Sequence, residues 1–235
     1  MRNRVLGTTT AVVLAGSLFS GGAAAQSDLG VSISGNVGAF SNYVWRGFTQ
    51  NADEAAVQGG ADASHDTGLY LGAWMSNLEG GDYEADLYGG WAGEFESVGV
   101  DVGLIRYFFP ATEDSDAAEV YAGLSYGPFS VTAYYNFWVA GVDEDQTALY
   151  VEGSASHEVV PSVTASLTVG GWTGDDDTNA IVNGDGDDYA WAGVSIAKAT
   201  DYGDLSLATT KNFSGIEGDD EFRFIVGWST GFDLL

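Results

Sequence analysis

The sequence predicts an all-β protein: a closed, antiparallel transmembrane β-barrel of about twelve strands joined in an up-and-down meander. Apolar and polar residues alternate with a period of two along most of the chain, and helical periodicity is almost absent. The alternating segments are mostly about ten residues long, which suits a tilted strand crossing a bilayer, whereas globular strands average about five or six residues. Short connections alternate with longer acidic ones, as in outer-membrane barrels.

The N-terminal segment has the features of a signal peptide. Arg2 and Arg4 form a basic start, an apolar stretch runs from Val5 to Phe19, and the small residues of AAAQ end near Ala25. A membrane anchor is the alternative, but the apolar stretch is shorter than the roughly 20 residues that a spanning helix needs. The sequence therefore predicts a signal peptide over residues 1–25 and an exported mature barrel over residues 26–235.

Twelve segments rich in Val, Tyr, Phe, Trp and Thr stand between clusters of Gly and Asp, which is the pattern of strands separated by turns. In chain order the predicted strands are residues 31–45, 55–65, 69–77, 83–92, 98–109, 118–126, 129–138, 147–156, 162–172, 189–198, 204–213 and 221–233. The even number places both termini at the same end of the barrel.

The connections support the same topology. Those after the second, fourth, sixth, eighth and tenth strands are tight: HDTG, EFES, GP, EVVP and TDYG. Those after the first, fifth, seventh, ninth and eleventh are mostly longer and acidic, culminating in TGDDDTNAIVNGDGDD. The connection after the third strand, LEGGD, is short where a long one is expected. Outer-membrane barrels have short periplasmic turns and longer external loops, which assigns the two ends.

Parity assigns the two faces of each strand. One face carries apolar residues such as Val98, Val100, Val102 and Leu104, and is predicted to face lipid. The other face carries polar residues and many glycines, and is predicted to enclose water. Six acidic residues in strand bodies share this inward parity: Asp62, Glu84, Asp86, Asp101, Glu119 and Glu152. Seven aromatic residues share it and are expected to fill much of the lumen: Tyr70, Trp74, Tyr88, Tyr107, Tyr121, Tyr134 and Tyr150.

A soluble β-sandwich also alternates, with its apolar face as the core. The long strands and the near-absence of Lys on the polar face disfavour it. So do the aromatic residues near strand ends, where membrane barrels carry interfacial girdles: Tyr43, Trp45, Trp74, Phe108, Phe109, Phe137, Trp138, Trp172 and Trp228.

Two arginines share the inward parity at the loop end. Arg46 would end the first strand and Arg223 would begin the last, so closure of the barrel would make them neighbours at the mouth. Both need nearby carboxylates, and the residues available are Glu54, Glu221 and inward-facing acids on neighbouring strands. Such a cluster either narrows the pore and orients solutes or is a structural ion pair that holds the mouth. The sequence alone leaves both interpretations open, a pore constriction and a structural ion pair.

The other basic residues of the mature chain, Arg106, Lys198 and Lys211, fall on or near lipid parity at strand ends. A long side chain there can keep its stem in hydrocarbon and its charge in the head-group layer. Arg106 and Lys211 would lie near lipopolysaccharide phosphates. A β-bulge that turns either residue inward is the alternative.

Four stretches carry a resemblance to a known family: SGNVGAFSNYVWRGFTQ at 34–50, LYLGAWMSN at 69–77, DLYGGW at 86–91 and DVGLIRYFFP at 101–110. They resemble the TorF family of porins, conserved exported proteobacterial proteins, over essentially the whole mature chain. The resemblance implies an outer-membrane β-barrel with channel function and supplies no substrate and no catalytic residues. The chain departs from the usual aromatic last residue of such barrels, because Phe232 lies three residues before its end.

The charged residues limit which partners and functions the chain can have. With 34 acidic and 7 basic residues the formal net charge is -27, which disfavours nucleic acid as a partner. The six inward carboxylates against Arg46 and Arg223 predict a passive, cation-preferring porin for small hydrophilic solutes or ions. Outer-membrane lipid and lipopolysaccharide are the other expected partners, and a homo-oligomer is one expected state. The alternatives are a non-conducting structural or surface-binding barrel and, less compatible with a polar lumen, a transporter of hydrophobic ligands.

Metal, cofactor and enzyme functions find little support in the sequence. Asp175, Asp177 and Asn179 have the alternating spacing of a calcium loop, but Ala180 and Gly186 stand where an EF-hand has Gly and Glu. A solvated acidic loop is the default reading. The chain has no cysteine and no sequence motif of a hydrolase, metalloprotease or nucleotide-binding protein, so neither a cofactor nor enzymatic activity is expected.

Overall fold

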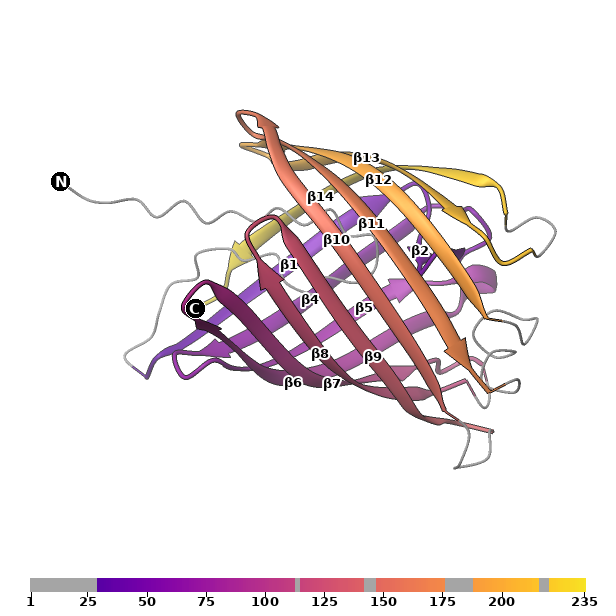
Figure 1. The fold of residues 1–235 in the computed structure, drawn as a ribbon, viewed down its shortest axis with the longest axis horizontal. Coiled ribbons are helices and arrows are strands. Elements are labelled where there is room, and N and C mark those ends of the chain that lie inside the picture. The colour runs from indigo at the N-terminus through magenta and orange to yellow at the C-terminus, as the bar shows by residue number, and fades with distance from the viewer. Residues whose placement is uncertain (1–28, 113–114, 142–146, 176–187, 216–219) are drawn as a thin grey trace.

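The computed structural model is a single closed barrel of tilted strands (Figure 1), and it describes residues 29–112, 115–141, 147–175, 188–215 and 220–235. The twelve barrel strands are β1 (Val31–Phe40), β4 (Ala56–His65), β5 (Leu69–Asn77), β6 (Tyr83–Phe95), β7 (Val98–Phe108), β8 (Ala117–Tyr126), β9 (Phe129–Val139), β10 (Ala148–Val160), β11 (Val163–Gly174), β12 (Tyr189–Thr200), β13 (Gly203–Asn212) and β14 (Phe222–Asp233). A separate two-stranded sheet pairs β2 (Val44–Trp45) with β3 (Phe48–Thr49). The short 3₁₀ helix η1 spans Glu79–Gly81.

Each barrel strand pairs antiparallel with its neighbours in sequence, and the ring closes where β1 pairs with β14. In this closing pair Ser34 lies opposite Asp233 and Phe40 lies opposite Gly227. On its other side β1 pairs with β4, from Val31 opposite His65 to Phe40 opposite Ala56. No strand of the ring has a free edge, so its backbone N–H and C=O groups are paired inside the sheet. The predicted twelve-strand antiparallel meander is confirmed.

The side chains follow the predicted parity. Apolar residues such as Leu71, Leu104 and Val194 point away from the barrel and are largely exposed, whereas alternate residues such as Tyr70, Tyr88 and Tyr150 are buried inside it. The core of this protein is therefore the lumen, and the outer wall is an apolar surface. Among the described residues no helix has the length and hydropathy to cross a membrane.

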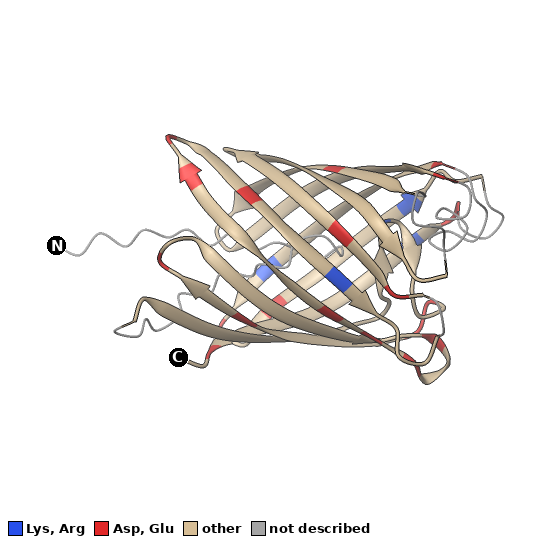
Figure 2. Ribbon diagram, turned by 90° about the horizontal axis from the view of Figure 1, so that it is seen from below, with Lys and Arg blue, Asp and Glu red and all other residues tan. Residues whose placement is uncertain are grey.

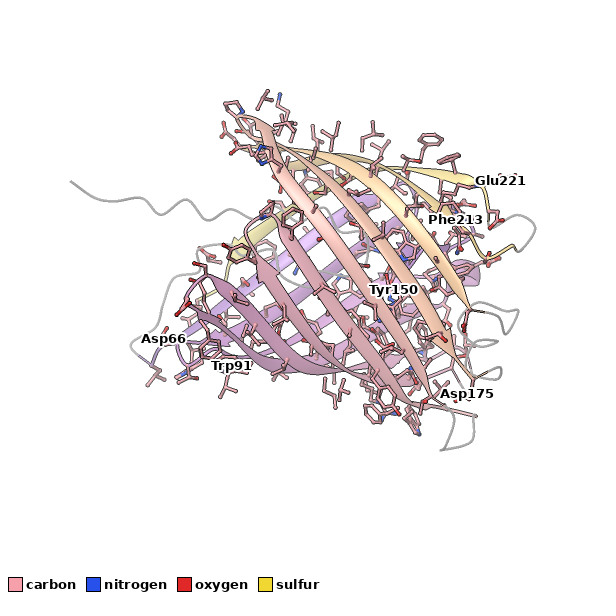
Figure 3. All side chains as sticks on the ribbon, in the orientation of Figure 1. Asp66, Trp91, Tyr150, Asp175, Phe213 and Glu221 are labelled. Carbon is pink, nitrogen blue, oxygen red and sulfur yellow. The ribbon has the colours of Figure 1, made fainter. Side chains whose placement is uncertain are left out.

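The two ends of the barrel differ. The tight turns and both ends of the described chain lie at one end, the terminal end, and the long connections lie at the other, the loop end (Figure 1). In Figure 3, Asp66 and Trp91 mark the terminal end, Asp175, Phe213 and Glu221 mark the loop end, and Tyr150 lies between them. Acidic positions far outnumber basic ones along the strands and at the loop end (Figure 2).

Strand bounds agree with the predicted ones to within a few residues, with one consequential exception. The first strand was predicted over 31–45, but β1 ends at Phe40. The chain then leaves the wall of the barrel, and residues 41–55 form a connection that contains β2 and β3. Arg46 therefore lies on this connection and not on a barrel strand, so the predicted neighbourhood of Arg46 and Arg223 on adjacent strands is wrong.

The apolar outer wall generates a depth-dependent prediction. Val194 lies in the middle of β12 and Leu205 near the terminal end of β13, and both are about half exposed on the outer face, at 50% and 53%. In lipid, Val194→Arg is expected to lower the free energy of unfolding by about 2–4 kcal/mol and Leu205→Arg by about 0–1 kcal/mol. Urea titration of the protein refolded in vesicles, followed by tryptophan fluorescence, measures both. An equal loss of unfolding free energy for Val194→Arg and Leu205→Arg would contradict a bilayer around the outer wall.

Candidate functional site

The connection between β1 and β4 folds into the lumen. Its Tyr43 ring lies 5.5 Å from the ring of Trp74 on β5, and its Trp45 ring lies 6.2 Å from that of Trp172 on β11. In the closed ring β5 and β11 are six positions apart out of twelve, which places them on opposite sides. One short segment that touches both walls must lie between them. We call residues 41–55 the lumen hairpin.

Local sequence explains the tight turn of the lumen hairpin. Val44 pairs with Thr49 and Trp45 with Phe48, which leaves Arg46 and Gly47 as a two-residue turn. Both have positive φ, 47° and 92°, as the favoured hairpin turns require. Gly47 also lies against the wall, because a β-carbon there would stand 2.8 Å from Cβ of Trp191.

The base of the hairpin is held by polar side chains. The Tyr43 amide donates to Oδ1 of Asn51 at 3.1 Å, and the Asn51 side chain donates to the Glu54 carbonyl at 2.6 Å. The Thr49 hydroxyl donates to the Asn42 side-chain oxygen at 2.8 Å and accepts from the Asp53 amide at 2.9 Å. These bonds satisfy backbone groups that would otherwise be unpaired inside the barrel.

At the tip, Arg46 forms a buried ion pair with Glu119 of β8. Its Nη1 and Nη2 donate to Oε1 and Oε2 of Glu119, each at 2.7 Å, and the two side chains are 2% and 1% exposed. Glu119 also accepts a hydrogen bond from the Tyr107 hydroxyl at 3.0 Å. The β8–β9 register shifts between Ala118 and Glu119. Such a bulge re-aims side chains, and here it lies beside the carboxylate that meets the hairpin.

Four aromatic rings surround the Arg46 guanidinium. Its Cζ lies 4.2 Å from the ring centre of Tyr150, 4.3 Å from Trp45, 4.7 Å from Tyr134 and 5.1 Å from Trp172. We call these four rings the aromatic cage. Each ring lies within the roughly 6 Å over which a cation is attracted to the π face.

The lumen rings lie close to the wall because glycines face them. A β-carbon at Gly170 would overlap the ring of Tyr150, and one at Gly72 would overlap the ring of Tyr88. Glycine is therefore required at both positions for the neighbouring ring to lie flat against the sheet.

Above the hairpin, toward the loop end, the lumen opens into a vestibule of about 220 Å³. Glu84, Glu119 and Asn136 line it, together with the rings of Trp45 and Trp172. Asp86 lies two residues beyond Glu84 on the same inward face of β6, and both carboxylates are buried. Among the described residues, the ion pairs bring one arginine, Arg46, to this group of three carboxylates. Carboxylates therefore outnumber cations around the vestibule.

The rim of the vestibule is tied by Asp82, which joins the β5–β6 and β7–β8 connections. Its carboxylate accepts from the Thr112 hydroxyl at 2.7 Å, from the Tyr83 amide at 2.6 Å and from the Ala111 amide at 3.2 Å. Slight burial acts to raise the pKa of Asp82, but these three hydrogen bonds outweigh it and hold the pKa below its ordinary value. Asp82 therefore keeps its charge at neutral pH beside the entrance.

The other predicted acidic residues lie on the inward face without joining the Arg46 pair. Asp62 accepts a hydrogen bond from Tyr88, and Asp101 accepts one from Tyr70 at 2.5 Å. Both lie in the half of their strands nearer the terminal end. Glu152 accepts from the Tyr150 hydroxyl at 2.7 Å, which connects it to the aromatic cage.

Arg223 lies apart from Arg46 and pairs with the hairpin's Asp53 at 3.2 Å. The predicted partners Glu54 and Glu221 form neither pair. The structure thus brings Arg46 together with Glu119, beside Glu84 and Asp86, and leaves Arg223 at the base of the hairpin. Sequence reasoning missed the hairpin, although Arg46-Gly47 between strand-forming residues is a signal for a tight turn.

The aromatic residues divide differently from the prediction. The seven predicted lumen aromatics do face inward and form or flank two clusters that Trp45 joins. Five residues predicted in the membrane girdle lie in the lumen instead, and one of them, Trp74, also stood in the predicted lumen set: Tyr43, Trp45, Trp74, Phe109 and Trp172. Tyr43 and Trp45 lie on the lumen hairpin, which leaves the barrel wall after Phe40, whereas Trp74 and Trp172 keep the inward parity of β5 and β11.

Of the predicted calcium loop, only Asp175 lies within the described residues; Asp177 and Asn179 lie outside them. Asp175 accepts a hydrogen bond from the Thr147 amide at 2.8 Å. Over the described parts of the chain no cluster of three or more His, Asp or Glu side chains has the arrangement of a metal site.

Comparison with known proteins agrees with this architecture. Residues 24–223 match the sequence model of a family described as a bacterial protein of unknown function (Gcw_chp). A KdgM porin superposes with a TM-score of 0.59 at 10% identity, covering 85% of this chain and 99% of that one. The KdgM porin in complex with disordered oligogalacturonate gives a TM-score of 0.57 at 10% identity, with 86% and 99% coverage.

A NanC porin gives a TM-score of 0.54 at 10% identity, with 85% and 98% coverage. At this identity the likeness shows the fold. A search of curated protein sequences finds no match.

The buried pair makes a stability prediction. Arg46→Ala leaves the Glu119 carboxylate buried and unpaired, and is expected to cost about 3–5 kcal/mol of unfolding free energy. Arg46→Met combined with Glu119→Met is expected to recover most of this loss, because no isolated charge remains. Arg106→Ala breaks the more exposed pair with Asp116, whose side chains are 43% and 30% exposed, and should cost less than about 1 kcal/mol. Denaturant titration in vesicles measures all three variants, and a cost at Arg46 no larger than at Arg106 would contradict a buried pair.

Proposed function

We propose a function from the geometry for this chain, which belongs to the Gcw_chp family of bacterial proteins. The proposal is an outer-membrane porin-like channel for passive diffusion of small hydrophilic solutes or ions, with a preference for cations. The observation that carries it is a closed barrel whose apolar wall surrounds a lumen lined by carboxylates. The porin fold of the KdgM and NanC neighbours supports it, and so does the resemblance to the TorF family.

The electrostatics of the vestibule support cation preference. Glu84 and Glu119 line the vestibule, and Asp86 is buried on the same inward face of β6 as Glu84, against one guanidinium, that of Arg46, which pairs with Glu119. Excess carboxylates raise the local concentration of cations and repel anions. An anionic sugar chain, such as the oligogalacturonate bound by one neighbouring porin, would meet this repulsion. We therefore propose a different solute class for this chain.

A non-conducting structural barrel is the second candidate, and the packed lumen favours it. Arg46, Tyr150 and Trp172 are almost completely buried within the lumen, so water has little access at this level. An open channel requires the hairpin to leave this position. An enzyme is not proposed: His65 and His157 lie toward the terminal end of β4 and β10, whereas the vestibule carboxylates lie toward the loop end.

The membrane placement is part of the proposal. A signal peptide over residues 1–25 would direct export, and the loop end would face outward. On the outer wall near that end, the Arg106 guanidinium lies 4.6 Å from the ring centre of Trp138, and Lys211 lies 5.3 Å from that of Phe222. Cations beside aromatic rings suit the head-group layer, with lipopolysaccharide as the outer partner. A homo-oligomer stays a prediction.

Conductance separates the two candidates. The wild-type protein in planar bilayers is expected to show small or infrequent openings, because the hairpin fills the lumen. The double variant with Arg46→Ala and Glu119→Ala releases the tip and is expected to raise conductance several-fold. Arg106→Ala, on the outer wall, serves as the control and should leave conductance unchanged. A double variant that folds but stays silent supports the non-conducting barrel.

Selectivity tests the vestibule charges. Glu84→Gln with Asp86→Asn removes two carboxylates at nearly constant volume, and is expected to lower the ratio of cation to anion permeability toward unity. Glu96→Gln removes an exposed carboxylate at the β6–β7 turn and should leave the ratio nearly unchanged. Reversal potentials in a salt gradient measure both. An anion-selective wild type, or an equal effect of the two changes, would defeat the cation preference.

A further inference from the structure

The aromatic cage has the composition of a receptor for organic cations. Four rings from the hairpin, β9, β10 and β11 converge on one guanidinium carbon, at 4.2 to 5.1 Å. Aromatic cages of this kind recognise organic cations through the π faces of the rings. Three of the four rings, Tyr134, Tyr150 and Trp172, are carried by barrel strands and not by the hairpin.

Glu119 adds shape selectivity to the cage. It accepts two parallel hydrogen bonds at 2.7 Å, which is the fork geometry of a planar guanidinium or amidinium group. An ammonium ion or a metal cation cannot make this paired contact as well. A guanidinium is also more weakly hydrated than an ammonium, so it loses less hydration free energy on entering a site without water.

The cage is accessible from the loop end through the vestibule. Trp45, Trp172 and Glu119 belong to both the cage site and the vestibule lining, so a solute in the vestibule already touches the carboxylate. Asn136 lines the same space, and its buried Oδ1 has no hydrogen-bond partner among the described residues. This acceptor and Glu84 provide sites for further N–H donors on a larger cation.

The occupant of the cage can leave without breaking the barrel. β2 and β3 pair only with each other and share no ladder with the barrel strands. Arg46 sits on the two-residue turn, with a positive φ. Withdrawal of the hairpin tip therefore exposes the cage while the ring of twelve strands stays closed.

We infer that the cage is a binding site for small guanidinium or amidinium solutes, and that Arg46 occupies it as a tethered competitor. The solute displaces Arg46 from Glu119, and this exchange loosens the hairpin. The inference rests on the proposed channel and names its solute class. The pair and the rings that hold the hairpin inward are then the same groups that recognise the solute.

Methylguanidinium is the probe that tests whether the cage binds guanidinium solutes in competition with Arg46. Binding to the purified, refolded protein in detergent is followed by tryptophan fluorescence, since Trp45 and Trp172 belong to the cage. The titration is run below denaturing concentrations against sodium chloride at equal ionic strength. Arg46→Ala removes the competitor, and the midpoint is expected to fall roughly tenfold or more, because a tethered group acts at an effective concentration of millimolar order. Arg106→Ala should keep the wild-type midpoint.

Two further variants keep the test decisive. Arg46→Lys retains the charge but not the planar fork, so methylguanidinium should displace it at a lower concentration than in the wild type. This variant gives the answer if Arg46→Ala does not refold. Arg46→Ala with Glu119→Gln should lose the saturable response, because the fork acceptor is gone. Equal midpoints in wild type and Arg46→Lys, or the same response to sodium, overturn the inference.

The binding assay needs no conduction, so the two proposals fail separately. A barrel that binds methylguanidinium as described but stays silent in bilayers overturns the channel and keeps the site. A barrel that conducts cations but shows no saturable response to methylguanidinium overturns the site and keeps the channel.

Discussion

Closure of the backbone ring is the constraint on which the rest of the structure depends. β1 pairs with β14 as well as with β4, so each of the twelve strands has two neighbours and none presents an unpaired edge. Once the ring is closed, the pleat divides every strand into an outward and an inward face. The apolar outer wall, the polar lumen and the grouping of turns at one end all follow from this one arrangement. The lumen hairpin is possible only because the ring closes without β2 and β3.

A ring of twelve strands encloses more space than its own small side chains fill, and the chain fills it in two ways. Inward tyrosines lie over inward glycines, as Tyr150 does over Gly170. The lumen hairpin supplies the remaining bulk, with Trp45 packed against the aromatic clusters of both sides. The result is a packed section beneath an acidic vestibule.

The parts of this structure that follow a local period could be predicted, and the part set by contacts across the lumen could not. The range 69–77 was predicted as observed in β5, because alternation and turn residues bound it on both sides. The inward parity of Glu84, Asp86 and Glu119 follows from the same period. Tyr43, Val44 and Trp45 favour a strand, so the turn signal of Arg46-Gly47 indicates the end of a wall strand as readily as the tip of a hairpin inside the lumen. Arg46 was therefore placed at the mouth, and its partner on β8, 73 residues away, has no signal at short range.

A buried ion pair is weak support for stability, because apolar side chains of similar volume often do as well or better. Other contacts already help to hold the hairpin: the Phe48 ring packs against the Tyr189 ring, and the polar side chains at the base hydrogen-bond to its backbone. The pair between Arg46 and Glu119 therefore needs a reason beyond holding the hairpin. Two properties of the pair supply such a reason. The bidentate geometry fixes the hairpin in a single register, and charges shielded by four rings can be exchanged only for a group of the same shape and charge. A contact that is costly for solvent to break and replaceable by a solute of matching shape and charge fits the proposed channel and the guanidinium site inferred in its lumen.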